Sequence, residues 1–308
     1  MNAWLIAFVV LSMNTLYGHV QDYLKLPAEK TGNHRMDNID FIYMINLDQR
    51  PEKFASCEKQ LAPYGIYPYR FSAVNGWELS FEALNNIGVI YEPWMENNNW
   101  GTCYFAENGG QPYHEIVHVP GRNYFCHCMA LGTIGIVLSH LSVLEDAFNS
   151  GYETIWVMED DIELVKDPHL ISDLIAKLDR TVGKKGWDML FTDQDTKGQN
   201  GEYVPCYGYA WRPNFKPKDP SIFAKRKRVS RDFRKIGSRY GTYSFIIRRQ
   251  GMEKILNFLK QHQVFLPYDM EFYFPDNMRI FTVTDDVVST QPKALSDNGA
   301  PNYLNTEN

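Results

Sequence analysis

The sequence predicts an α/β fold, with a mostly parallel sheet flanked by helices in a single domain. Short apolar runs rich in strand-forming residues alternate with longer stretches of helical periodicity. The first three such segments read strand, helix, strand, and that order favours a parallel sheet covered by helices. With 308 residues the chain is long enough for one large domain, or for one domain with an excursion.

The opening segments define the first strand, helix and strand. The run "DFIYMINL" at 40–47 predicts a strand. Pro51 suits the first turn of the helix that follows, and the apolar periodicity of that helix stops at Gly65. The run "IYPYRFSAV" at 66–74 then predicts the second strand, so these residues form a β-α-β unit.

The middle and late parts of the chain continue the alternation. A long helix is predicted at 130–151, and the strand "TIWVM" follows it at 154–158. Further helices are predicted at 170–183 and 251–262, and further strands at 187–192, 241–249 and 279–286. No internal repeat is present in the sequence. These segments fill one domain at 38–295.

Four stretches lack a regular period. Residues 19–37 are predicted to be a linker and 296–308 a tail. Residues 85–128, rich in Asn and Gly, are predicted to be an irregular excursion over the surface, and such long loops are often functional or mobile. Residues 216–239 are predicted to be a basic loop.

Charge is distributed unevenly along the chain. The net charge is −6, which argues against a nucleic-acid partner for the chain as a whole. Between Lys216 and Arg239, ten Lys or Arg oppose Asp219 and Asp232, a local balance of 10 − 2 = +8 that leaves −14 elsewhere. Two interpretations of this basic loop stay open: a mobile clamp for an anionic ligand, or a solvated cationic surface.

The N-terminus carries an apolar run from Ala3 to Leu11, which is short for a membrane span. It resembles the core of a signal peptide, with Gly18 at a suitable place for cleavage. We therefore expect residues 1–18 to be a signal peptide or an anchor, although an ordinary buried segment is the third alternative. A signal peptide implies the secretory pathway or export; otherwise we expect a cytoplasmic protein with peripheral membrane association.

Five cysteines are present, at 57, 103, 126, 128 and 206. If the chain is exported, a disulfide between Cys103 and either Cys126 or Cys128 would stiffen the excursion. The "CHC" at 126–128 invites a zinc interpretation, but no second ligand pair lies at the spacing of a zinc finger.

Three adjacent carboxylates, Glu159, Asp160 and Asp161, follow the predicted strand at 154–158 directly. Ligands of open parallel sheets bind beyond the carboxyl ends of the strands, so these side chains are expected over a ligand crevice. Their mutual repulsion costs on the order of 1 kcal/mol per pair even in water. A hard divalent cation, Mn²⁺ or Mg²⁺, would relieve it and coordinate substrate phosphates. The alternatives are a solvated acidic loop or a cap for the next helix.

Several stretches in order resemble the signatures of glycosyltransferase family 25, which includes bacterial lipooligosaccharide galactosyltransferases and collagen galactosyltransferases. The resemblance covers about residues 40–275. The stretches are "YMINLDQRPEKF" (43–54), "RFSAVNG" (70–76), "GTIGIVLSHLSVLEDAFNSG" (132–151), "IWVMEDDIEL" (155–164), "WDMLF" (187–191) and "GTYSFIIRRQGMEKIL" (241–256).

The resemblance implies a GT-A, Rossmann-like fold and inverting transfer of a hexose, galactose or glucose, from a UDP-sugar. It implies a glycan, a lipid-linked or a protein-linked acceptor, as in lipopolysaccharide biosynthesis. Carried onto this chain, Asp161 would bind Mn²⁺, and Glu159 would face the ribose or a metal-bound water. Asp160 completes this donor-binding triplet.

Four further residues match the family's donor-site motifs. Asn46 and Arg50 are candidates for uridine or phosphate contacts, and Asn75 with Gly76 would close the same pocket. Against this, Asn46 is equally suited to forming a turn, and Arg50 to a surface position beside Asp48. His140, in the "SH" of the long helix, is either a donor contact or a buried, hydrogen-bonded side chain.

Inversion also requires a base that takes the proton of the acceptor hydroxyl. The position that resembles the family's is Asp269, with Glu271 and Asp193 as rivals; Asp269 is also suited to capping a helical turn. Two other functions remain open from the sequence. A metal-dependent phosphoester hydrolase would need further spaced His or Asp ligands, and a non-catalytic sugar-binding module would keep the fold without turnover.

Overall fold

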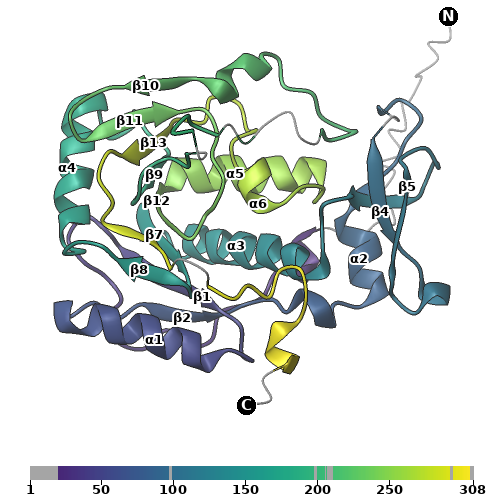
Figure 1. Cartoon of the computed structure of the whole chain (residues 1–308), viewed down its shortest axis with the longest axis horizontal. Helices are drawn as coiled ribbons and strands as arrows, with labels where there is room; N and C mark the ends of the chain where they lie inside the picture. Colours follow the sequence, from purple (N-terminus) through teal and green to yellow (C-terminus); the bar gives the residue numbers. More distant parts are fainter. Residues whose placement is uncertain are drawn as a thin grey trace, which may run out of the picture.

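The computed structural model describes residues 20–96, 99–197, 200–204, 206, 211–291 and 294–305. An eight-stranded sheet lies at its centre with helices on both faces, which confirms the predicted α/β class (Figure 1). The strand order is β10-β11-β13-β9-β12-β7-β1-β2. All of the predicted signal peptide or anchor lies outside the described residues, as does the end of the predicted tail.

The strands of this sheet run mostly in one direction. β1 pairs in parallel with β2 and β7, and β9 with β13, whereas β12 and β11 run against their neighbours. The expectation of a mostly parallel sheet is therefore confirmed, with two reversed strands. The bounds are β1 Phe41–Asn46, β2 Tyr69–Ser72, β7 Thr154–Glu159, β9 Met189–Phe191, β10 Arg226–Arg228, β11 Phe233–Ile236, β12 Ser244–Arg248 and β13 Ile280–Val283.

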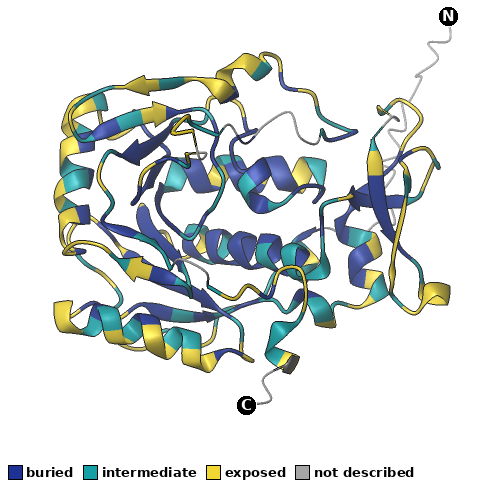
Figure 2. Ribbon diagram, viewed as in Figure 1, coloured by how far each residue is buried: buried dark blue, intermediate teal, exposed yellow. Residues whose placement is uncertain are grey.

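The helices cover the sheet because successive side chains of each strand point to opposite faces. On β1, Tyr43 packs in the core beneath α3 (Leu131–Asn149) and α5 (Arg249–His262). Its neighbour Met44 packs in the second core, beneath α1 (Pro51–Leu61) and α4 (Leu170–Val182). In Figure 2 the outer sides of α1 and α4 are exposed, whereas α3 is buried along most of its length.

Helix α3 is the one helix of the described residues that is long and apolar enough to cross a membrane by length and composition. Most of it is buried inside the protein, against the sheet and α5. Its apolar character is therefore that of a core helix, and its N-terminal half positions His140 close to the end of β7.

The excursion predicted as irregular is in fact partly ordered. After α2 (Phe81–Ile87), residues 89–126 form a four-stranded antiparallel sheet in the order β3-β6-β4-β5, on the right of Figure 1. No period was visible in the sequence because the strands are short, and β5 is largely exposed on both faces. The bounds are β3 Val89–Ile90, β4 Trp100–Tyr104, β5 Pro112–Ile116 and β6 Asn123–Cys126.

The expected link between Cys103 and Cys126 or Cys128 is not present, because all five cysteines are free. β4 and β6 pair with Gly101 opposite Cys126, so Cys103 lies two positions further along β4. Its Sγ contacts Oε1 of Glu115 at 3.8 Å instead. Cys126 lies close to Cys128, with 2.9 Å between the two sulfur atoms.

The basic segment at 216–239 is likewise not a single loop. It contains η5 (Pro220–Ala224) and the hairpin β10–β11, which extends the main sheet. Buried Phe233 and Ile236 attach this hairpin to the sheet, but they stand among too many Lys and Arg for a period to be visible.

The remaining elements connect the layers and close the carboxyl edge of the sheet. β8 (Ile162–Leu164) pairs with β14 (Val288–Thr290), and the chain then passes in front of α3 to its end (Figure 1). The short helices are α6 Tyr268–Glu271, η1 Val20–Tyr23, η2 Ala62–Tyr64, η3 Gly76–Glu78, η4 Ala106–Asn108 and η6 Asn302–Asn305. The predicted linker thus contains η1.

Candidate functional site

Two adjoining pockets lie where β1, β2 and β7 end. The first, here called the main cleft, has a volume of about 120 Å³ and is the smaller of the two. Its wall includes Lys53, the stretch 73–77, the triplet 159–161 and residues 296–298. The second, here called the side pocket, is lined by Cys128, Thr133, Ile136, Glu159, Tyr240, Gly241, Thr242, Tyr243, Pro267, Tyr268, Asp269, Met270 and Asn298. Ile136, Glu159 and Asn298 line both pockets.

Glu159 is the last residue of β7 and stands between the two pockets. Its backbone N–H donates at 2.8 Å to the carbonyl of Tyr243, the residue that precedes β12. Its Oε1 accepts hydrogen bonds from Nε2 of His140 at 3.0 Å and from Oγ1 of Thr242 at 3.1 Å. His140 is buried and stacks on the ring of Tyr268, with 4.3 Å between ring centroids. It therefore has the predicted buried, hydrogen-bonded character and also lines the main cleft.

Asp160 lies in the turn that follows β7. Its Oδ2 accepts a hydrogen bond from Nδ2 of Asn46 at 2.6 Å, and Nζ of Lys53 lies 4.0 Å from Oδ1. Burial raises the pKa of Asp160, against the lowering effect of the Lys53 charge and the Asn46 hydrogen bond. Asp160 is thus held in place by the loop and helix that follow β1.

Asp161, the third carboxylate, lines the main cleft without an ion pair. Its Oδ1 is buried and has no hydrogen-bond partner among the described residues. Burial, followed by the charges of Glu159 and Asp160, raises the pKa of Asp161 to about 7. A buried carboxylate oxygen without a partner is costly, so this oxygen fits a bound cation well.

The triplet does not form a closed metal site. No group of three or more His, Cys, Asp or Glu side chains is arranged to hold a metal ion in the described part of the chain. Mg²⁺ and ions like it commonly bind one or two carboxylates and take their other ligands from water and substrate phosphates. The donor set at Asp161 and Glu159 fits a cation of that kind, shared with a ligand.

Asn46 and Arg50, which were predicted to contact the donor, are buried and form hydrogen bonds with other residues of the protein. Asn46 donates to Asp160 and to the carbonyl of Arg50, and it accepts from Nε of Arg70 at 2.7 Å. Nε of Arg50 donates to Oδ2 of Asp297 at 2.8 Å. Neither lines the main cleft, but each positions a residue that does. Arg50 is buried and so is not a surface cation, whereas Asn46 bridges the turn after β1 through its bond to Arg50.

Asn75 and Gly76 do lie in the wall of the main cleft, at the start of η3. Asn75 donates to Glu78 at 2.8 Å and to the hydroxyl of Tyr303 at 2.9 Å. A Cβ on Gly76 would lie 1.8 Å from the carbonyl oxygen of Leu131, so only glycine allows η3 to approach the start of α3 this closely.

Asp269 lies in the side pocket, on α6. Its Oδ2 accepts a hydrogen bond from the backbone N–H of Gly241 at 3.0 Å, and burial raises its pKa. The neighbouring Tyr268 is buried, and its hydroxyl has no partner among the described residues. The side pocket therefore presents a carboxylate and a free hydroxyl next to Glu159.

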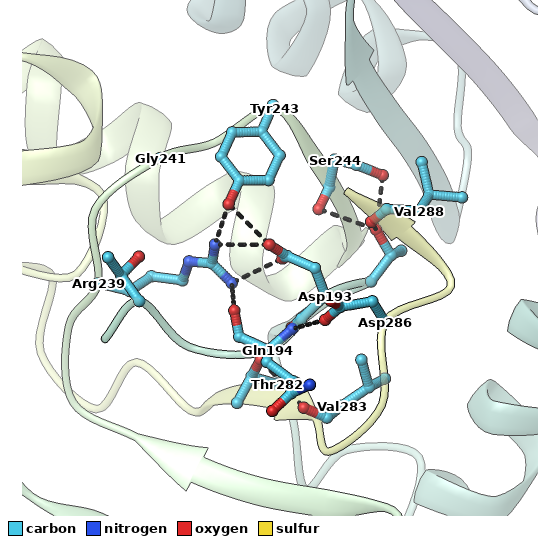
Figure 3. A network of polar contacts seen from close by, with 12 residues as sticks. Asp193, Gln194, Arg239, Gly241, Tyr243, Ser244, Thr282, Val283, Asp286 and Val288 are labelled. Carbon is cyan, nitrogen blue, oxygen red and sulfur yellow. Dashed lines mark hydrogen bonds and ion pairs between the residues drawn. The ribbon is translucent and has the colours of Figure 1, made fainter. Parts of the chain in front are cut away.

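The two rivals of Asp269 are engaged elsewhere. Glu271 is fully buried in an ion pair with Arg212 and accepts the backbone N–H of Phe265. Asp193 pairs with Arg239 at 2.8 Å and accepts the hydroxyl of Tyr243 at 2.7 Å (Figure 3). Neither carboxylate lines the main cleft or the side pocket.

The basic hairpin β10–β11 lies away from the main cleft. β10 is at the opposite edge of the sheet from β2, and four strands separate it from β7. At a spacing of about 4.8 Å between neighbouring strands, that places β10 about 24 Å from β7. The hairpin therefore does not line the main cleft, and the interpretation of the whole segment as a clamp for an anionic ligand stays a prediction.

Several residues of the site were not predicted from sequence. The sequence assigns Lys53 only to a helix, although its position three residues after Arg50 in the opening motif could have indicated a role in the site. Nothing in the sequence around Gly132 or Asp297 indicates a role in the site. A Cβ on Gly132 would lie 2.5 Å from the carbonyl of Asp297, so this glycine lets the C-terminal segment close the cleft. The predicted tail thus begins within the wall of the site.

Comparisons with known proteins agree with the order of these motifs. The sequence profile of glycosyltransferase family 25 (LPS biosynthesis protein) matches residues 39–272. A "Glycosyltransferase 25 family member" of Drosophila melanogaster is 25% identical over 235 residues, which cover 76% of this chain and 30% of that protein. A protein of the same name from Aedes aegypti is 29% identical over 167 residues, which cover 54% of this chain and 22% of that protein.

A human relative named "Inactive glycosyltransferase 25 family member 3" is 25% identical over 157 residues, covering 49% of this chain and 21% of that protein. The chain spans less than a third of the length of each of these curated relatives.

Proposed function

Because this chain belongs to glycosyltransferase family 25, we propose that it is a metal-dependent inverting transferase that moves a hexose from a UDP-sugar to an acceptor. The observation that supports this most is Oδ1 of Asp161, which is buried in the wall of the main cleft without a partner. In this proposal the sheet, with its cleft at the strand ends, is a GT-A arrangement, and the main cleft is the donor site.

The residues around the triplet would bind and orient the donor. Asp161 and Glu159 would hold Mn²⁺ or Mg²⁺, which supplies positive charge to the diphosphate of the leaving UDP. Asp160, fixed by Asn46 and facing Lys53, sets the position of the turn that carries Asp161. Asn75, Gly76 and the C-terminal segment enclose the nucleotide.

The side pocket would bind the acceptor, with Asp269 as the base. A carboxylate whose pKa is raised by burial is a stronger proton acceptor than an exposed one. Asp269 would take the proton of the acceptor hydroxyl as that oxygen attacks the anomeric carbon from the face opposite UDP. The side pocket adjoins the main cleft at Glu159, which supports this division of roles. Galactose or glucose is the proposed sugar, and a glycan or a lipid- or protein-linked sugar the proposed acceptor.

A thermal-shift measurement with UDP, with and without Mn²⁺, tests the donor site. We expect UDP with Mn²⁺ to raise the melting temperature by on the order of several degrees, and UDP with a chelator to raise it far less. No response to UDP under either condition would contradict the proposed donor site. Hydrolysis of UDP-galactose and UDP-glucose then identifies the preferred sugar.

A second candidate function is sugar-nucleotide binding without turnover. The observation that favours it is the human relative named inactive, which covers part of the same region. In this case UDP would stabilise the protein in the presence of Mn²⁺, but neither UDP-sugar would be hydrolysed or transferred. The retained Asp161, Glu159 and Asp269 favour the active transferase.

A further inference from the structure

The turn after β6 brings two thiols together at the rim of the side pocket. Cys126 ends β6, Cys128 follows two residues later, and their sulfur atoms lie 2.9 Å apart. This is closer than the ordinary contact of two sulfur atoms, and closing it to the ~2.05 Å of a disulfide bond requires a movement of about 0.9 Å. The two sulfur atoms therefore lie within about 0.9 Å of the distance at which they would be covalently linked.

The two thiols differ in access. Cys126 is 1% exposed, whereas Cys128 is partly exposed and lines the side pocket. The two thiols share a hydrogen bond, which lowers the pKa of Cys128 and raises that of Cys126. A reagent that enters the side pocket thus meets Cys128 first, in the form closest to a thiolate.

Cys126 is equipped for the second step. Nδ1 of His127 lies 3.7 Å from the sulfur of Cys126, where it can accept the thiol proton. The backbone N–H of Cys128 donates to the same sulfur at 3.5 Å and would stabilise a thiolate there.

The other cysteines lack such features. Cys57, Cys103 and Cys206 are buried, and burial raises the pKa of each thiol. They serve as internal references for reactivity in the same molecule.

We propose that Cys126 and Cys128 form a redox-active dithiol that reacts with low-molecular-weight disulfides such as oxidised glutathione. The Cys128 thiolate attacks one sulfur of the reagent, forming a mixed disulfide and releasing one glutathione thiolate. Cys126 then loses its proton to His127 and attacks the sulfur of Cys128, releasing the second glutathione. The two thiol protons end on the two glutathione molecules, so one disulfide is reduced as the Cys126–Cys128 bond forms.

This chemistry has a consequence for the side pocket, which rests on the proposed function. The mixed disulfide on Cys128 would place a tripeptide in the pocket that contains Asp269, and so block the acceptor. Cys128 does not line the main cleft, so UDP binding should be unaffected. Glutathione on Cys128 would thus block transfer without affecting donor binding until the Cys126–Cys128 bond forms and releases it.

The test uses the reduced full chain in glutathione buffers of graded ratio. The protein is unfolded in the presence of an alkylating agent, so that every remaining thiol is alkylated, and the masses of its digested peptides are measured. We expect the peptide that contains both Cys126 and Cys128 to lose two hydrogen atoms and escape alkylation, while Cys57, Cys103 and Cys206 remain thiols. Full alkylation of both residues at every glutathione ratio would overturn the proposal.

Two variants separate the steps. Cys126→Ser should trap glutathione on Cys128 as a stable adduct, and Cys128→Ser should leave Cys126 unreacted because it is buried. Cys103→Ser is the matched control and should behave as the parent chain. An adduct on Cys126 in the Cys128→Ser variant, at the rate seen for Cys128, would contradict the assigned order. Thermal shifts with UDP, measured on the reduced and on the oxidised chain, report separately on the donor site. If UDP bound in neither state, the proposed function would be refuted, but the result for the two thiols would still hold.

Discussion

Arg50 and Asp297 join two distant parts of the chain at the wall of the main cleft. Nε of Arg50 donates to Oδ2 of Asp297 at 2.8 Å, although 247 positions separate them in the sequence. Both side chains are buried, so the ion pair is little screened by solvent. The carbonyl of Asp297 also accepts the indole N–H of Trp77 at 2.9 Å. The C-terminal segment is therefore a fixed wall of the site.

The close approach of this segment to α3 gives the first prediction. Gly132→Ala would place a Cβ within 2.6 Å of the carbonyl oxygens of Asp297 and Asn298, which would push the segment away from α3. Because such a displacement misplaces the wall of the donor site, we expect the Kd for UDP to rise on the order of tenfold. Isothermal titration with UDP and Mn²⁺ measures it. Gly299→Ala, where a Cβ meets no atom within 4 Å, is the control and should leave the Kd unchanged.

Asp161 gives the second prediction, which concerns metal dependence. Asp161→Asn removes the charge that would attract the cation, and we expect the stabilisation of the protein by UDP with Mn²⁺ to fall to that seen with a chelator. Thermal shift measures this. Asp173→Asn, exposed on α4, is the matched control. Equal UDP stabilisation in the Asp161 variant and the parent chain would exclude Asp161 as a metal ligand.

The same residue gives a third prediction, about stability without metal. The pKa of Asp161 is about 7 in the folded protein against 3.8 for an unperturbed Asp. Between these values the folded state binds more protons than the unfolded state, so the contribution of Asp161 to stability falls as pH rises from about 4 to about 7. In a chelator, Asp161→Asn should therefore raise the melting temperature at pH 8, and by less at pH 5. A variant that melts lower than the parent at pH 8 would contradict the repulsion described here.

The predicted helices and strands are all present, because the central strands are apolar runs buried on both faces and the helices carry an apolar stripe that packs on the sheet. Residues 40–47, 130–151 and 154–158 correspond to β1, α3 and β7 within a few residues. The small sheet was missed because β5 is exposed on both faces, and the hairpin β10–β11 because charged residues surround its two buried anchors.

For the site, the sequence predicted that acidic residues lie at the strand ends, but not which of them are paired with a basic residue and which face a pocket. Only the resemblance to the family placed Asp269 ahead of its rivals Asp193 and Glu271. Only tertiary contacts show that Arg239 neutralises Asp193 and Arg212 neutralises Glu271, whereas Asp269 faces a pocket. Asn46 and Arg50 lie behind the wall of the main cleft, and their hydrogen bonds to Asp160 and Asp297 depend on segments more than a hundred positions away.

The Arg212–Glu271 pair gives a fourth prediction, about folding. Arg212→Met would leave Glu271 buried without its charge partner, and removing one member of a buried pair costs about 3–5 kcal/mol. Urea unfolding measures this loss. The double variant Arg212→Met with Glu271→Gln should recover part of it, because no unpaired charge then remains. Equal destabilisation of the single and double variants would show that lost packing, not the unpaired charge, is responsible.

Asp269 gives the last prediction, which separates binding from transfer. Asp269→Asn keeps the size of the side chain and its hydrogen bond from Gly241 but cannot accept the acceptor's proton. Because general base catalysis contributes roughly 10²–10⁴-fold, we expect kcat for transfer to fall by about that factor while the Kd for UDP with Mn²⁺ is unchanged. Transfer from the preferred UDP-sugar and titration with UDP measure the two quantities. Asp276→Asn, exposed and paired only with Lys218, is the control for a lost surface carboxylate. A parallel loss of UDP affinity in the Asp269 variant would place this residue in the donor site instead. An unchanged kcat would show that Asp269 is not the base.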